Sequence, residues 1–166
     1  MDQGPVLLAL YDRALPQVYG YLLPRCGGAT AEDLTAETFL AAVTAVQRGA
    51  VPDLTVAWLV GVARHKLVDH WRREAREERK LRVLADEPQG DDDPWDERID
   101  RALAHEALAR LGPHHRSALT LRYLDGLPVP EVAEHLGRTV HATEALLVRA
   151  RTAFRRTYGE GGGDDG

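Results

Sequence analysis

The fold is decided by the stretch Gly126-Leu127-Pro128-Val129-Pro130-Glu131-Val132-Ala133-Glu134-His135-Leu136-Gly137-Arg138-Thr139-Val140. It predicts a short helix over 130–136, a turn at Gly137 and a longer helix that Thr139 caps at its N-terminus. Two helices joined by such a turn form a helix-turn-helix. An ordinary helical hairpin with solvated arginines is the alternative. The glycine turn, the cap and the basic end of the second helix favour DNA binding.

The second helix, predicted to run to about Tyr158, has one inward stripe with the spacing i, i+4, i+7, i+11. This stripe consists of Thr143, Leu147, Ala150 and Phe154. The opposite face carries polar, small and basic side chains, namely His141, Glu144, Ala145, Val148, Arg149 and Arg155. Such a face fits a DNA major groove, where arginine contacts phosphate or guanine.

The rest of the chain also shows helical periodicity, and no strand pattern competes with it. Helices are predicted over 6–25, 30–47, 56–84, 99–111 and 114–124. Thr30 is the expected start of the second of these, because acidic residues follow it in the first turn. The predicted fold class is therefore all-α.

Charge divides the chain into two parts. The segment 58–85 has 8 basic and 4 acidic residues, 101–158 has 9 and 5, and 86–100 between them has 1 and 8. The overall charge of −5 therefore comes from the middle segment and the ends. The prolines and repelling carboxylates of the middle segment predict an extended, mobile linker. The expected organisation is two small helical domains, 5–84 and 99–158, an acidic flexible linker over 85–98, and a tail over 159–166.

Several classes of function find no support in the sequence. No apolar run approaches the roughly 20 residues that span a bilayer, and the N-terminus lacks the pattern of a secretory signal. A cytoplasmic protein without membrane insertion of its own is expected. Cys26 is the only cysteine, and the histidines have no accompanying ligand set, so neither a metal nor a cofactor is predicted. No set of nucleophile, base and orienting group indicates an enzyme.

A second functional segment is Ala57–Arg73, which begins apolar and becomes strongly basic. Its cations and rings, among them Arg64, His65, Lys66 and Trp71, suit melted nucleic acid, where bases stack and phosphates need neutralising. A solvated basic helix with two core tryptophans is an equally good interpretation of this segment alone. We expect Trp58 to be buried and Trp71 to be partly exposed.

A third segment, Asp33-Leu34-Thr35-Ala36-Glu37-Thr38-Phe39-Leu40, combines an acidic face with apolar residues. Asp33 and Glu37 are four residues apart and therefore share a face. Leu34, Phe39 and Leu40 are expected to pack inward. Composition alone predicts no more than a solvated acidic face.

Taken together and in this order, the three segments resemble the extracytoplasmic-function sigma factors. Asp33–Leu40 is similar to the family's polymerase-clamp motif Asp-Leu-Thr-Gln-Glu-x-Phe-Leu. Trp58–Arg73 resembles its segment that melts and recognises the −10 promoter element. Leu111–Arg151 resembles its region that recognises the −35 element. The resemblance covers nearly the whole chain outside the linker and the tail.

The resemblance implies a sigma factor that directs RNA polymerase to specific promoters and starts transcription, with no catalysis of its own. The implied partners are core RNA polymerase, promoter DNA and an anti-sigma factor. The polymerase contacts would be Asp33, Leu34, Glu37 and Phe39. The −10 contacts would be Arg64, His65, Lys66, Asp69, Trp71, Arg72 and Arg73, and the −35 contacts Thr139, His141, Glu144, Ala145, Val148, Arg149, Arg151 and Arg155.

Four positions depart from the family pattern. Ala36 replaces a usual Gln, which puts one polymerase contact in doubt, and His65 replaces a common Asn. Gly112 stands where Pro is common, and Leu146 replaces an Arg that would contact phosphate. Three rival interpretations remain, namely a stand-alone helix-turn-helix regulator, a decoy that binds polymerase without supporting transcription, and an enzyme.

Overall fold

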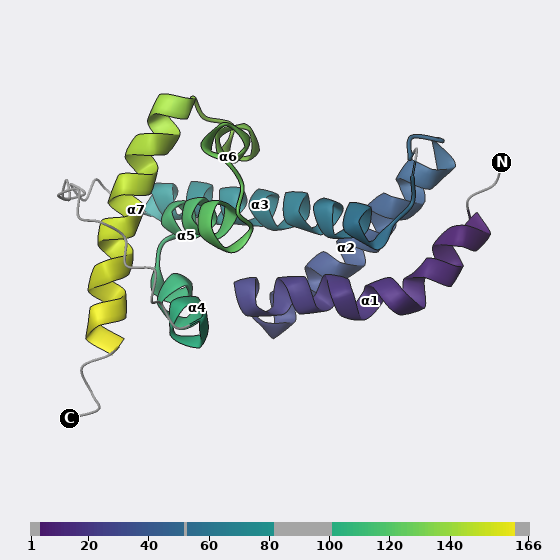
Figure 1. Cartoon of the computed structure of the whole chain (residues 1–166), viewed down its shortest axis with the longest axis horizontal. Coiled ribbons are helices and arrows are strands. Elements are labelled where there is room, and N and C mark those ends of the chain that lie inside the picture. Colours follow the sequence, from purple (N-terminus) through teal and green to yellow (C-terminus); the bar gives the residue numbers. More distant parts are fainter. Residues whose placement is uncertain (1–3, 52, 82–100, 162–166) are drawn as a thin grey trace. The chain divides into compact units, whose positions relative to one another are not determined.

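The computed structural model describes residues 4–51, 53–81 and 101–161, and within these ranges the chain is all-α, as predicted (Figure 1). The predicted linker over 85–98, the expected continuation of the third helix to residue 84 and the end of the tail lie outside the described residues. The chain forms two compact units, Met1–Asp69 and His70–Gly166. The division falls inside helix α3 (Val56–Leu81).

The first unit is built on helices α1 (Gly4–Cys26) and α2 (Gly28–Gln47), which pack against each other. Gly27 separates them with a φ of +82°, a conformation that glycine adopts without steric cost. Helix α2 therefore begins at Gly28, and the predicted start at Thr30 is wrong. The glycine ends one helix and begins the next within a single residue, so Thr30 already lies inside the first turn.

One face of α1 and one of α2 form the core of this unit. The apolar spacing of α1 is confirmed for Leu7, Leu10, Ala14, Val18 and Leu22, which are all buried. Leu34 and Phe39 of α2 are buried as expected, but Leu40 is 67% exposed, so its predicted inward packing is wrong. Thr38 and Phe39 are both buried, so the buried side of α2 is centred between them. Leu40 lies about 200° around the helix from Thr38 and therefore falls on the exposed side.

The second unit combines the end of α3 with helices α4 (Arg101–Arg110), α5 (Pro113–Leu119), α6 (Val129–Leu136) and α7 (Val140–Gly161). Helix α7 is the longest of these four and packs against α4, α5 and α6 (Figure 1). Its buried side chains therefore form the centre of the C-terminal core.

The helix predicted over 114–124 differs in two respects. It begins at Pro113, which suits the first position of a helix because this residue has no N–H to leave unpaired. After Leu119 it widens into the π-helix η1 (Thr120–Leu124), where the Asp125 N–H donates to the Thr120 carbonyl at 3.0 Å. Apolar periodicity did not distinguish this widened turn from an α-helix.

Arg116 ties α5 to the end of α4. Its guanidinium donates to the carbonyls of Leu108 at 3.1 Å, Ala109 at 3.0 Å and Leu111 at 2.9 Å. These are carbonyls at a helix C-terminus, which have no partner within the helix and favour a positive charge. Arg116 is therefore a structural residue that fixes the turn between α4 and α5.

Candidate nucleic-acid interface

The helix-turn-helix consists of α6, a turn at Gly137 and α7. Gly137 has a φ of +64°, and the Arg138 N–H donates to the Ala133 carbonyl at 3.0 Å, which closes the end of α6. The Ala142 N–H donates to the Thr139 hydroxyl oxygen at 3.1 Å. The glycine turn and the N-terminal cap predicted from the sequence are both confirmed.

Helix α7 has the inward stripe that its spacing predicted. Thr143, Leu147, Ala150 and Phe154 are each no more than 3% exposed. Leu146 is also buried, at 2%, so it belongs to the core. Leu146 therefore lies on the inward side of α7, away from the outward side that carries Glu144, Val148 and Arg149.

The other predicted residues of this interface share the outward side of α7 and its N-terminus. Thr139, His141 and Glu144 are exposed, whereas Ala145, Val148, Arg149, Arg151 and Arg155 are half-buried. Arg151 donates to the hydroxyl of Tyr123 in η1 at 3.0 Å. This bond holds the Arg151 guanidinium against η1. The position of that guanidinium therefore depends on the π-helical turn of η1.

The predicted −10 residues lie along α3, where the structure separates them by exposure. His65, Asp69, Arg72 and Arg73 are exposed, whereas Arg64 and Lys66 are half-buried. The Arg64 guanidinium lies 5.9 Å from the centre of the Tyr21 ring. Apart from the acidic Asp69, these are the arginines, lysine and histidine that the sequence indicated for this segment.

The prediction for the two tryptophans is wrong. Trp71 is only 1% exposed, whereas Trp58 is half-buried. The reason is that Trp71 continues a stripe of buried residues spaced four apart, formed by Leu59, Ala63, Leu67, Trp71 and Ala75. Trp58 precedes that stripe by one residue. Trp71 therefore stabilises the hydrophobic core of the unit. Its ring is too deeply buried in this structure to stack on a nucleic-acid base.

Helix α2 carries the predicted polymerase contacts on two different sides. Asp33 is exposed and Glu37 half-buried, whereas Leu34 and Phe39 are buried and support the helix from inside. Leu40 and Ala36 lie on the same exposed side as the acids and line an apolar groove of about 840 Å³ between α1 and α2.

The groove was missed in the sequence because Leu40 was assigned to the core. It is also lined by Leu7, Leu8, Tyr11, Phe39, Val43 and Val46. Leu8 is 76% exposed, and no residue of the described ranges covers it. The spacing Asp33, Ala36, Glu37, Leu40 follows i, i+3, i+4, i+7 and thus defines one face, which is the signal that could have revealed this surface.

A helix-turn-helix together with a helix rich in basic residues is typical of DNA-binding proteins. Comparison with known proteins specifies the class further. The family model "Sigma-70 region 2" matches residues 10–77, and "Sigma-70, region 4" matches residues 101–154.

Several relatives share most of this chain. The sigma factor BldN of Streptomyces coelicolor is 37% identical in a match that covers 89% of this chain. The match covers only 58% of the length of BldN, so this chain spans a little over half of that relative. SigC of Mycobacterium tuberculosis is 33% identical over 91% of this chain and 82% of its own length. The sigma factor RpoE of Bartonella quintana, whose structure was solved in complex with the anti-sigma factor NepR, has the same fold. The TM-score is 0.54 and the sequence identity is 19%. The match covers 90% of this chain and 94% of the RpoE chain.

The chain belongs to the extracytoplasmic-function group of the sigma-70 family. None of the helices in the described part of the chain is long and apolar enough to cross a membrane.

Proposed function

We propose that this protein directs RNA polymerase to specific promoters and starts transcription, under the control of an anti-sigma factor. The observation that carries the proposal is the helix-turn-helix with a capped α7 and an outward basic face, on the same chain as a match to sigma region 2. The protein contributes binding rather than catalysis, and its place of action is the cytoplasm, where promoters and polymerase are.

The proposal divides the work between the regions. Helix α7 enters the −35 major groove, where the outward residues Glu144, Ala145, Val148 and Arg149 face bases. Helix α3 and the loop before it bind the melted −10 strand through the exposed His65, Arg72 and Arg73. Trp71 supports α3 from inside in the structure described here.

The polymerase contact in this proposal is the exposed face of α2. Carboxylates next to open apolar surface fit a partner helix with basic and apolar side chains. Ala36 belongs to this face and lines the groove, so the short side chain leaves room for a partner side chain. The predicted contacts were Asp33, Leu34, Glu37 and Phe39. Ala36 and Leu40 are added as contacts on the exposed face, and the buried Leu34 and Phe39 support that face from inside.

Run-off transcription tests the proposed function directly. The protein is combined with core RNA polymerase on a library of genomic promoters, and transcripts are sequenced from their 5′ ends. The expected result is a set of start sites that require the protein and share sequence elements near −10 and −35. A polymerase-bound protein that yields no transcript would establish the decoy, and promoter binding at full strength without polymerase would establish the stand-alone regulator.

Substitution of Arg149 by alanine is expected to cost about 1–3 kcal/mol in promoter binding and to relax the preference at one base pair. The reason is that arginine pairs with guanine through two hydrogen bonds, which no other base offers in the same place. The measurement is a promoter-library selection with the holoenzyme that contains the variant.

Arg155→Ala is the matched control, because it removes the same charge from a residue farther along α7. It is expected to weaken all promoters alike and to reduce the salt dependence of binding, as a phosphate contact does. If Arg149→Ala also lowered transcription uniformly, with the sequence preference unchanged, Arg149 would be a phosphate contact.

A further inference from the structure

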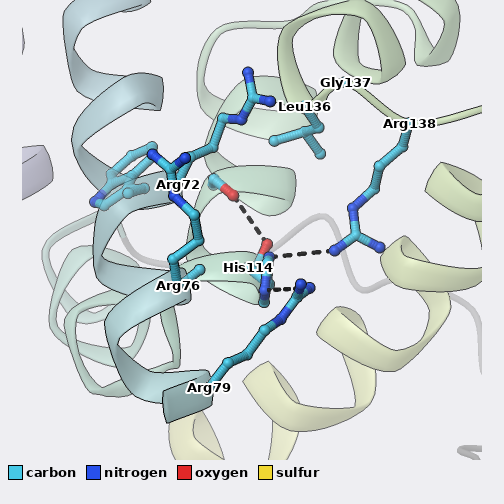
Figure 2. A pocket seen from close by; sticks show the side chains of 10 residues that line it. Arg72, Arg76, Arg79, His114, Leu136, Gly137 and Arg138 are labelled. Atoms are coloured by element: carbon cyan, nitrogen blue, oxygen red, sulfur yellow. Dashed lines mark hydrogen bonds between the residues drawn. The ribbon is translucent and has the colours of Figure 1, made fainter.

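A cavity in the second unit collects positive charge from two parts of the chain that are distant in sequence. It has a volume of about 340 Å³ and is lined by Trp71, Arg72, Ala75, Arg76, Arg79, His114, Ser117, Leu136, Gly137 and Arg138 (Figure 2). Four of these residues are arginines and none is acidic. Three of the arginines come from the end of α3, and the fourth follows the turn of the helix-turn-helix.

His114 lies between guanidinium groups from both parts. Its Nε2 is 3.1 Å from Nη2 of Arg79, and its Nδ1 is 3.3 Å from Nη2 of Arg138, as the dashed lines in Figure 2 indicate. Arginine can only donate hydrogen bonds, and a neutral imidazole has one accepting nitrogen. His114 can therefore accept from one of these two arginines at a time, and from neither once it is protonated.

Two further arginines of the cavity lining come from α3, namely Arg72 and Arg76. No hydrogen bond or ion pair joins Arg72 or Arg76 to another residue of the described ranges. The buried Nε1 of Trp71, also a donor, has no partner there either. Glu74 of α3 lies 3.1 Å from His70 and 3.9 Å from Arg116, and neither of these two residues lines the cavity.

The position of Arg72 is limited by the turn of the helix-turn-helix. A Cβ atom built on Gly137 would lie 3.0 Å from Nη2 of Arg72, which is closer than side chains ordinarily approach. The absence of a side chain at Gly137 thus lets a guanidinium of α3 reach the turn. The backbone also requires glycine there, since φ is +64°.

We propose that this cavity binds a compact phosphoanion with two or three phosphate groups. Like charges at short range repel one another, and an anion between them replaces that repulsion with charge-assisted hydrogen bonds. Guanidinium groups match the geometry of phosphate oxygens. The volume lies at the lower end of the range for small-ligand sites, which favours a compact ligand over a long polymer.

The test is isothermal titration calorimetry of the full chain with inorganic pyrophosphate at low ionic strength. Arg79→Ala and Arg138→Ala are each expected to raise the dissociation constant about tenfold or more, because each removes a charged hydrogen-bond donor. Lys80→Ala and Arg156→Ala are the matched controls. Both remove an exposed basic residue from the same two helical regions without touching the cavity, and both are expected to change the constant less than about twofold.

Dependence on both Arg79 and Arg138 is the decisive result, since a basic helix alone would not require a residue from the other part of the chain. Absence of pyrophosphate binding, or equal losses in the control variants, would overturn the proposal.

A single-stranded hexanucleotide is titrated in parallel. If it bound with the same dependence on Arg79 and Arg138 while pyrophosphate did not bind, the site would belong to nucleic acid and the proposal would fail. Circular dichroism of each variant establishes that the fold is retained.

Discussion

Replacement of Trp71 by alanine is expected to lower the free energy of unfolding by about 3–5 kcal/mol, one of the largest effects of any single substitution in this chain. The indole is 1% exposed and continues the buried stripe of α3 between Leu67 and Ala75. Its removal leaves a cavity that neighbouring helices refill only in part. The measurement is urea-induced unfolding of the full chain, followed by circular dichroism.

Trp58→Ala is the matched control, because it removes the same side chain from the same helix at a half-buried position. It is expected to lower the free energy of unfolding by about 1 kcal/mol.

Trp71→Phe is a second control. It keeps an aromatic ring and removes the Nε1–H, which has no partner among the described residues. It is expected to cost clearly less than Trp71→Ala. Equal losses for Trp58→Ala and Trp71→Ala would contradict the burial described here.

Much of the fold could be predicted from the sequence because local signals and tertiary packing agree. The spacing of Thr143, Leu147, Ala150 and Phe154 correctly predicted the buried side of α7, and the Thr139 cap its start. Leu146 could have been assigned to the same stripe, because it lies three residues after Thr143. The resemblance to the family compares residues by position and says nothing of the direction in which the Leu146 side chain points.

The candidate sites were less predictable, for reasons that differ between residues. Trp71 lies among cations, with Arg72 and Arg73 directly after it, which favours a solvated position. Its spacing of four from Leu67 indicates burial, and the structure confirms burial. The apolar character of Leu40 predicts inward packing, but its neighbour Phe39 already occupies the core and Leu40 is exposed. The arginine cavity was not predictable, because Arg79 and Arg138 are brought together only by tertiary packing.

Charge reversal of the proposed polymerase contact, in the double variant Asp33→Lys and Glu37→Lys, is expected to weaken association with core RNA polymerase by at least about 100-fold. The two residues lie one turn apart on α2, next to the apolar groove lined by Leu40, so both face the same partner surface. A partner that offers cations to this face would meet two like charges, which costs several kcal/mol. The measurement is a fluorescence titration of labelled protein with core polymerase.

The matched control is the double variant Asp12→Lys and Asp53→Lys. It produces the same change in net charge at two exposed residues of the first unit that lie outside α2. It is expected to change association by only a few-fold, because exposed charges at a distance are screened by salt. Circular dichroism is expected to show unchanged helicity in both variants, since Asp33 is exposed and Glu37 only half-buried. If the Asp33→Lys and Glu37→Lys variant bound core polymerase as tightly as the unchanged protein, the exposed face of α2 would not be part of the polymerase interface. That result would not affect the proposed promoter contacts of α7.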